Sequence, residues 1–146
     1  LHLSIRRQRQ MCIRDRLLAI FESAADIPRN RGVIIMQSTG NRHSEAWERS
    51  LIEKSLSTTM REAFADYFIA WAKTDFSSNV QGLRTPLKVL IGEHDPHLTA
   101  EFMQQTIMQW FSNAELEVLR NAGHYPMLEI PVNLSTICEN FMWLHR

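Results

Sequence analysis

The sequence predicts an α/β protein whose C-terminal part is a βαβα unit, and three observations support this prediction. Two short apolar runs, residues 87–91 and 116–119, have the length and composition of buried strands. Each run is followed by a polar turn, Gly-Glu-His-Asp-Pro at 92–96 and Gly-His-Tyr-Pro at 123–126. One helical pattern lies between the runs and another follows them. Because strands joined by a helix pair in parallel, both polar turns are expected at one edge of the sheet.

Prolines and an N-cap residue indicate where the elements of this unit begin. Pro86 ends any preceding helix and opens the first strand. Thr99 is a predicted N-cap with Glu101 in the first turn, and Pro131 fits the first position of the last helix. The residues of the first helix expected to face the sheet are Met103, Ile107, Trp110 and Phe111. The expected buried face of the last helix consists of Leu134, Ile137, Cys138, Phe141 and Leu144.

Residues 17–80 are predicted to be mainly helical. Ser44 is expected to cap one helix, and Thr59-x-x-Glu62 matches a capping box for another. Aromatic residues recur at helical spacing in the second of these helices: Phe64, Tyr67, Phe68 and Trp71. The stretch 30–41 is compatible with either a short strand or a helical turn.

Composition divides the chain into three parts. Residues 1–16 carry five arginines and one aspartate and lack an amphipathic period. This leader resembles translated adapter or read-junction sequence and is kept out of the fold prediction. The alternative is a basic arm that binds nucleic acid or a membrane. A small, polar stretch at 74–78 leads from the helical segment, 17–80, to the α/β part, 81–146.

The balanced charge of the whole chain, 16 basic and 16 acidic residues, becomes 11 against 15 without the leader. No basic stripe interleaved with aromatic residues follows, so we expect no nucleic-acid partner. The apolar run 17–21 is too short for a signal peptide, and no segment approaches the ~18 apolar residues of a membrane span. Cys12 and Cys138 form no disulfide framework, and Cys138 is expected to be a small core residue. These features favour a cytoplasmic protein.

Asp95 and His124 occupy the two polar turns and are the candidate catalytic residues. An imidazole, with an unperturbed pKa of about 6.5, can take a proton from a hydroxyl nucleophile and return it to a leaving group. A buried carboxylate on the other ring nitrogen fixes the tautomer and stabilises the imidazolium. The plainer interpretations are a structural loop histidine and a turn-forming aspartate. No Gly-x-Ser-x-Gly motif surrounds any of the five glycines of the sequence.

The two turns resemble those of a known family. A strand followed by Gly-x-x-Asp-Pro resembles the acid turn of the α/β-hydrolase fold. A strand followed by Gly-His-x-Pro, with Glu129 and Pro131 soon after, resembles its histidine loop, and the order of acid before histidine agrees. The resemblance covers 82–146 and implies the C-terminal part of such a fold, with 17–80 as a helical cap. Because the family order is nucleophile, acid and then histidine, it also implies a nucleophile upstream of this sequence. It also implies a structural role for Glu129, which is expected to satisfy loop backbone or a nearby donor.

A metal site is the competing interpretation of the same turns. His94, Asp95 and His97, together with His124, could be drawn as a two-histidine, one-carboxylate site. The short gaps and the intervening proline oppose convergence of these side chains, so no metal and no cofactor are expected. Glu93 and His94 are instead expected to be solvated turn residues, while His97 either touches substrate or caps the next helix.

Four aromatic residues of the predicted cap are candidates to line an apolar substrate pocket: Trp47, Phe64, Phe68 and Trp71. The plainer interpretation is that these side chains form ordinary helix core. The expected partner is an apolar small molecule.

The predicted function of the parent protein is hydrolysis of an ester or similar acyl bond through a Ser-His-Asp triad, with the present residues inactive by themselves. Two alternatives keep the fold. One uses an Asp nucleophile on epoxides or haloalkanes, and the other is haloperoxidase-like or cleaves carbon–carbon bonds. An alternative of another class is a non-catalytic module that binds a small molecule or a partner. These functions differ at the nucleophile.

Overall fold

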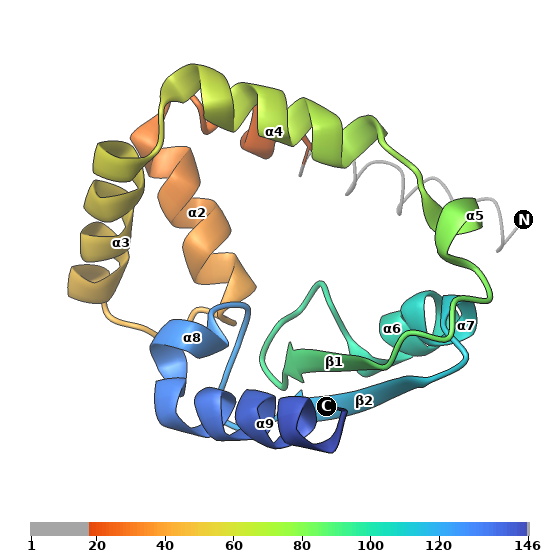
Figure 1. The fold of residues 1–146 in the computed structure, drawn as a ribbon. Helices are drawn as coiled ribbons and strands as arrows, with labels where there is room; N and C mark the ends of the chain where they lie inside the picture. Colours follow the sequence, from red (N-terminus) through yellow and green to blue (C-terminus); the bar gives the residue numbers. More distant parts are fainter. Residues whose placement is uncertain (1–17, 146) are drawn as a thin grey trace, which may run out of the picture. The chain divides into compact units, whose positions relative to one another are not determined.

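A computed structural model describes residues 18–145 of the 146-residue chain (Figure 1). The predicted leader, 1–16, lies outside the described residues. The protein is a mixed α/β structure with a two-stranded parallel sheet. After a short helix at 18–23, the elements are α2 (Pro28–Ser38), α3 (Glu45–Thr58), α4 (Arg61–Lys73), α5 (Ser77–Val80), β1 (Leu87–Gly92), α6 (Ala100–Gln105), α7 (Ile107–Trp110), β2 (Ala114–Leu119), α8 (Pro126–Glu129) and α9 (Pro131–Leu144).

The chain divides into two compact units. The helical unit comprises the described residues up to Ile35 and His43–Thr74, and the sheet unit comprises Met36–Arg42 and the residues from Asp75 onward. The units divide after Thr74, whereas the boundary expected from the sequence lies after residue 80. The segment Met36–Arg42 belongs to the sheet unit although its first residues, up to Ser38, form the end of α2, a helix of the predicted cap.

Of the two helix starts predicted in the helical unit, the one at Ser44 is observed and the one at Thr59 is not. Residues 30–41, for which the sequence allowed either a strand or a helical turn, form most of α2 and the turn after it. Ser44 caps α3 by accepting a hydrogen bond from the N–H of Trp47 (3.3 Å), as predicted. The predicted capping box at Thr59 is wrong, because Thr59 ends α3 by donating its N–H to Ser55 and α4 starts after Met60.

Arg31 of α2 connects three elements of the helical unit. Its side chain is buried, and Nε donates to the carbonyl of Ala24 (2.8 Å) while Nη1 donates to Ser55 Oγ of α3 (2.8 Å). Its guanidinium carbon lies 4.4 Å from the centre of the Phe64 ring in α4. A buried cation is tolerated because these acceptors and the ring face replace the water it has lost.

The two strands of the sheet unit pair in parallel over six residues, with Leu87 opposite Ala114 and Gly92 opposite Leu119. Each strand is longer than its apolar run, because β1 includes Gly92 and β2 starts at Ala114. Lys88 lies between the carboxylates of Glu115 (3.4 Å) and Glu117 (2.9 Å), so an ion pair compensates the polar residues within β2. Both loops that carry the candidate residues leave the same sheet edge.

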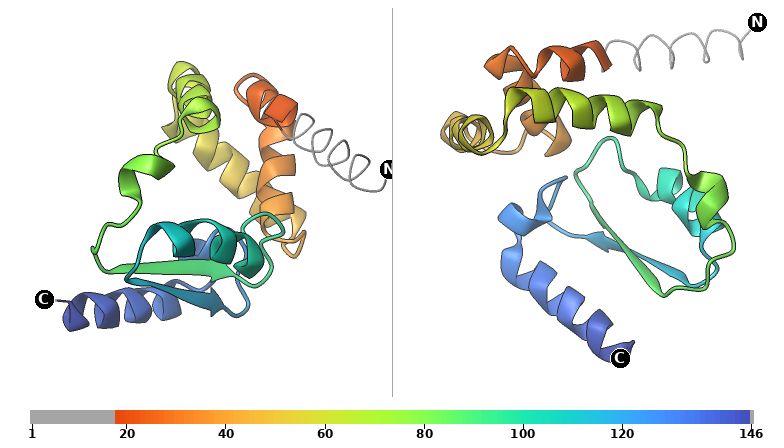
Figure 2. Two further views of the ribbon diagram at one scale, coloured as in Figure 1. Left: turned by 90° about the vertical axis from the view of Figure 1, so that its right-hand side faces the viewer. Right: turned by 45° about the horizontal axis from the view of Figure 1, so that its top comes forward.

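Helices lie on both faces of this sheet, with α6 and α7 on one side and α9 on the other (Figure 2). Thr99 caps α6 as predicted, and Met103 is buried. The single helix expected there breaks at Thr106, whose hydroxyl donates to the carbonyl of Phe102 (2.7 Å) and competes with the helical backbone pattern. Pro131 opens α9 as predicted.

The apolar surfaces of the sheet unit are only partly covered. Its buried apolar residues are Ile91, Met103, Leu119 and Ala122. Leu144, predicted for the buried face of α9, is 80% exposed because it is the last residue of the helix, so this prediction is wrong. The prediction of Cys138 as a core residue is also wrong, because no residue of α9 is fully buried and Cys138 is a free, half-buried thiol.

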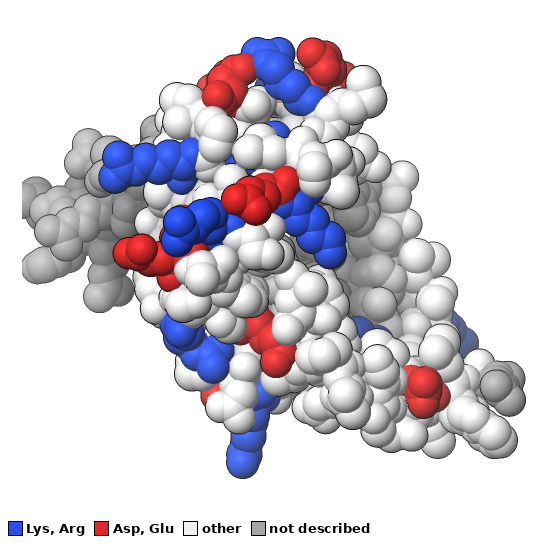
Figure 3. Space-filling view, turned by 90° about the vertical axis from the view of Figure 1, so that its left-hand side faces the viewer, with Lys and Arg blue, Asp and Glu red and all other residues white. Residues whose placement is uncertain are grey.

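The charged side chains drawn in Figure 3 are mixed in sign, with basic and acidic groups alternating over the described residues of that face. Between residues 18 and 145, no helix combines the length and the apolar composition needed to cross a membrane.

Candidate active site

Asp95 lies in the loop that follows β1. Its Oδ1 atom accepts hydrogen bonds from the backbone N–H groups of His97 (2.8 Å) and Leu98 (3.1 Å). These bonds form an Asx-type turn, which fixes the orientation of the carboxylate. The side chain is 2% exposed, so its second oxygen, Oδ2, is held within the protein.

His124 lies in the loop that follows β2, and its ring reaches Asp95. The distance between His124 Nδ1 and Asp95 Oδ2 is 2.6 Å, well within the limit of about 3.2 Å for a hydrogen bond. The predicted proximity of the two side chains is therefore confirmed. The side chain of His124 is 45% exposed, so part of the ring is open to solvent.

The ionisation of Asp95 determines the tautomer of His124. Burial by itself would raise the pKa of Asp95, but hydrogen bonds from His124 and from the backbone of His97 and Leu98 outweigh burial and lower this pKa below its usual value. The carboxylate is ionised at neutral pH and can only accept. His124 must then donate from Nδ1, which leaves the lone pair on Nε2 to act as a base.

Asp95 should therefore contribute to the decrease in the free energy of unfolding at acidic pH. Because its pKa in the folded protein is below the unfolded value of about 3.9, its contribution is fully present above that pH and is lost as the pH falls through the folded pKa. We expect wild type to be more stable than Asp95→Asn at pH 7, with the difference shrinking below about pH 4. Urea unfolding at both pH values measures this, with exposed Asp66→Asn as control. A difference that does not change with pH would contradict the assignment.

Tyr125 packs beside the ring of His124. The two ring centres are 5.6 Å apart and the planes are nearly perpendicular, at 78°. Burial raises the pKa of Tyr125, and the negative charge of Asp95 raises it further. The phenol therefore stays neutral at ordinary pH and adds no charge next to the His124–Asp95 pair.

The two loops are bonded and packed directly against each other. The N–H of His94 donates to the carbonyl of Ala122 (3.0 Å), and a Cβ added to Gly92 would lie 2.1 Å from the carbonyl oxygen of Gly123. No side chain fits there, because the contact is with backbone that cannot move aside. This close backbone approach holds Asp95 and His124 at hydrogen-bond distance.

Glu129, in α8, binds the backbone of the histidine loop. Its carboxylate is 1% exposed and accepts from the N–H of Gly123 (2.9 and 3.0 Å to its two oxygens) and from the N–H of Tyr125 (3.1 Å). Arg42 lies 3.3 Å from the same carboxylate. The predicted structural role of Glu129, satisfying loop backbone and a nearby donor, is confirmed.

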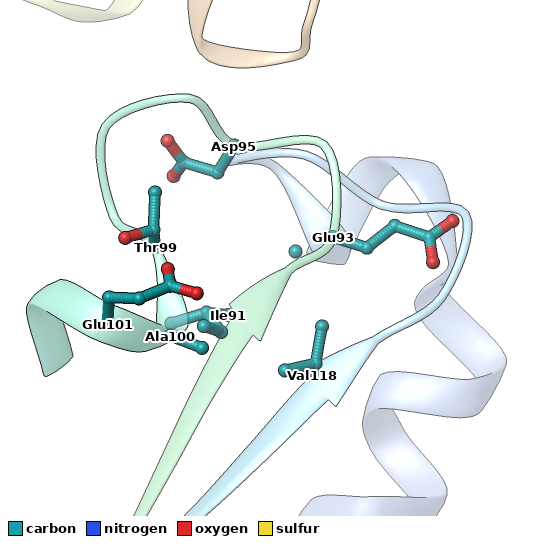
Figure 4. Close-up of a pocket in the computed structure, with 8 residues that line it drawn as sticks. Ile91, Glu93, Asp95, Thr99, Ala100, Glu101 and Val118 are labelled. Carbon is teal, nitrogen blue, oxygen red and sulfur yellow. The ribbon is translucent and has the colours of Figure 1, made fainter. Parts of the chain in front are cut away.

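A cavity of about 280 Å³ adjoins Asp95 at this edge of the sheet (Figure 4). It is lined by the strand ends, the following loop and the start of α6: Ile91, Gly92, Glu93, Asp95, Thr99, Ala100, Glu101 and Val118. In Figure 4 the carboxylate of Glu93 points away from Asp95. His124 does not line the cavity, so the space lies on the Asp95 side of the pair.

Glu93 and His94 are partly exposed turn residues, as expected, and Glu93 also bonds to the second loop. Glu93 Oε1 accepts from the N–H of Asn121 (2.9 Å) and lies 2.8 Å from His94 Nε2. The bond from Asn121 is the main reason that the pKa of Glu93 is lowered. Within the described part of the chain, no three His, Cys, Asp or Glu side chains converge as a metal site requires.

The four aromatic residues predicted to line a pocket lie in α3 and α4 of the helical unit. Phe68 and Trp71 form a cluster with Phe21, whose ring centre is 6.1 and 5.3 Å from theirs. Phe64 packs under Arg31, and the ring of Trp47 stacks on His43 at 3.9 Å. Trp71 is 62% exposed. The structure thus brings Phe68 and Trp71 together and gives Phe64 and Trp47 other partners.

The segment Met36–Arg42 is the part of the site that sequence reasoning missed. The carbonyl of Ser38 accepts the N–H of His124 (3.0 Å), and Arg42 pairs with Glu129. Gly40 and Asn41 after an apolar helix are a recognisable helix-end signal. No pattern in the sequence connects that signal to a loop more than 80 residues later.

No protein-family model matches the chain, and no curated protein matches it closely enough to count as a relative. The geometry and charges of the site are therefore the basis for its chemistry.

Proposed function

We propose that the chain carries the acid and base of an α/β-hydrolase-type enzyme that cleaves an ester or similar acyl bond, with the serine nucleophile supplied by upstream sequence. The observation that supports this most strongly is the 2.6 Å contact between His124 Nδ1 and the ionised, buried carboxylate of Asp95. The pair lies at the carboxyl ends of parallel strands, the usual location of ligand sites in α/β proteins.

In the proposed reaction, His124 Nε2 takes the proton of the serine hydroxyl as its oxygen attacks the acyl carbon. The imidazolium that forms is stabilised by Asp95 through Nδ1–H, and His124 then returns the proton to the leaving alcohol. Water, deprotonated by the same nitrogen, then attacks the acyl carbon, and the proton passes to the serine oxygen as the acyl–serine bond breaks and the acid leaves. Hydrolysis therefore needs both the buried carboxylate and the exposed side of the ring.

The test is to express the open reading frame extended upstream to its natural start codon and to read the residue at its nucleophile elbow, where we expect Gly-x-Ser-x-Gly. We expect this longer protein to hydrolyse short-chain p-nitrophenyl esters. The 146 residues alone should show no hydrolysis above background, because they contain no Gly-x-Ser-x-Gly elbow to supply the nucleophile and its adjacent oxyanion N–H. Replacing the elbow serine by alanine is the control. An Asp in the elbow, a degenerate elbow, or an extended protein without esterase activity would contradict the proposal.

A further inference from the structure

The backbone around His124 is bound by acceptors from two other segments. The N–H groups of Gly123 and Tyr125, one on each side of His124, both donate to Glu129. The N–H of His124 itself donates to the carbonyl of Ser38 (3.0 Å). Three consecutive peptide groups are therefore held, which leaves the loop little freedom to rotate the His124 side chain away from Asp95.

Arg42 supplies the positive charge that the buried carboxylate of Glu129 needs. Its Nη1 lies 3.3 Å from Glu129 Oε2, and its Nη2 donates to the carbonyl of Asn121 (3.4 Å). A buried carboxylate without a charged partner is costly, even when backbone N–H groups bind it. Arg42 thus compensates Glu129 and also binds the start of the histidine loop.

The turn that presents Ser38 and Arg42 is itself well defined. The N–H of Asn41 donates to Met36 (2.8 Å) and that of Gly40 to Gln37 (3.0 Å), which is the Schellman pattern at the end of α2. Gly40 has φ of +69°, a conformation that favours glycine. A Cβ added to Gly123 would lie 2.6 Å from Thr39 Cα, so the turn packs directly on the histidine loop.

We propose that Arg42, acting through Glu129, is a positioning residue that holds His124 in hydrogen-bond contact with Asp95. The inference rests on the proposed function only for the catalytic role of His124, because the contacts are independent of any reaction. Without Arg42, the buried carboxylate loses its charge partner, the bonds to Gly123 and Tyr125 weaken, and the ring samples orientations away from Asp95.

The test uses NMR of the protein with Arg42→Ala and Glu129→Gln. In wild type, the Nδ1–H proton of His124 should give a strongly downfield resonance, as expected for a short bond to a carboxylate. In both variants this resonance should be lost or broadened. The amide hydrogens of Gly123 and Tyr125 should exchange with solvent about tenfold faster or more, because local opening of the loop becomes easier. The matched controls are Arg49→Ala and Glu139→Gln, which change exposed residues on α3 and α9.

Faster amide exchange with an unchanged His124 resonance would overturn the inference, because Glu129 would then only stabilise the loop. Unchanged exchange rates of the Gly123 and Tyr125 amides in both variants would overturn it as well. Arg42→Lys keeps the charge but not the two-pronged guanidinium, so a partial effect is expected, and this variant serves if Arg42→Ala does not fold. In an active extended protein, Arg42→Ala should lower kcat more than it raises KM. NMR changes without esterase activity in any extended form would reject the proposed function and leave the positioning role standing.

Discussion

The His124→Ala variant of the extended protein is expected to lose ester hydrolysis by about 10⁴-fold or more, because general-base catalysis and the imidazolium contact to Asp95 vanish together. The loss should appear in kcat, because the proposed role of the ring is to take a proton in the transition state and not to bind substrate. Residual turnover would come from the nucleophile and the oxyanion donors alone.

Removing His124 also affects the folded state. The Oδ2 atom of Asp95 would lose its partner while remaining buried, and an unsatisfied buried acceptor costs about 1–3 kcal/mol. We therefore expect a modest fall in melting temperature, in contrast to the large fall in rate. Steady-state kinetics and thermal unfolding on the same samples separate the two effects.

The control for this experiment is His145→Ala, which removes an exposed histidine just beyond α9 and should leave kcat unchanged. Activity of His124→Ala within tenfold of wild type would remove this residue from the mechanism.

The parts of the fold that could be predicted from sequence are those set by local chemistry. The strand runs, the caps at Ser44 and Thr99 and the proline at the start of α9 each depend on a few neighbouring residues. The proximity of Asp95 and His124 was predictable for a different reason, because parallel pairing brings the ends of neighbouring strands together wherever they lie in the chain.

The features that could not be predicted depend on competition or on distant contacts. Thr59 could cap the next helix or end the previous one, and its backbone bond to Ser55 decides the choice. Thr106 matches the helical pattern, yet its backbone is not helical (φ −125°, ψ −97°) and the helix ends there. Arg42 has no signal at all, because its role follows from the position of Glu129, 87 residues away.

The second large effect is expected for Asp95→Asn, and the geometry of the turn explains why an almost isosteric change should be so damaging. The backbone N–H groups of His97 and Leu98 both point at Oδ1, so that position requires an acceptor. The amide oxygen of asparagine must occupy it, which places the amide NH₂ at the position of Oδ2, 2.6 Å from His124 Nδ1. Two donors cannot face each other there, so His124 is forced to accept at Nδ1 and to carry its proton on Nε2.

The wrong tautomer removes the base without removing the ring. We expect kcat to fall by about 10⁴-fold, the loss found for the same substitution in a serine protease triad. Nitrogen-edited NMR should show the proton on Nε2 of His124 in the variant and on Nδ1 in wild type. The control is Asp75→Asn, since Asp75 also accepts a backbone N–H two residues ahead (Ser77, 2.9 Å) but is exposed and has no histidine partner. An Asp95→Asn protein that keeps Nδ1 protonated, or whose kcat is within tenfold of wild type, would show that the carboxylate serves the turn and not the histidine.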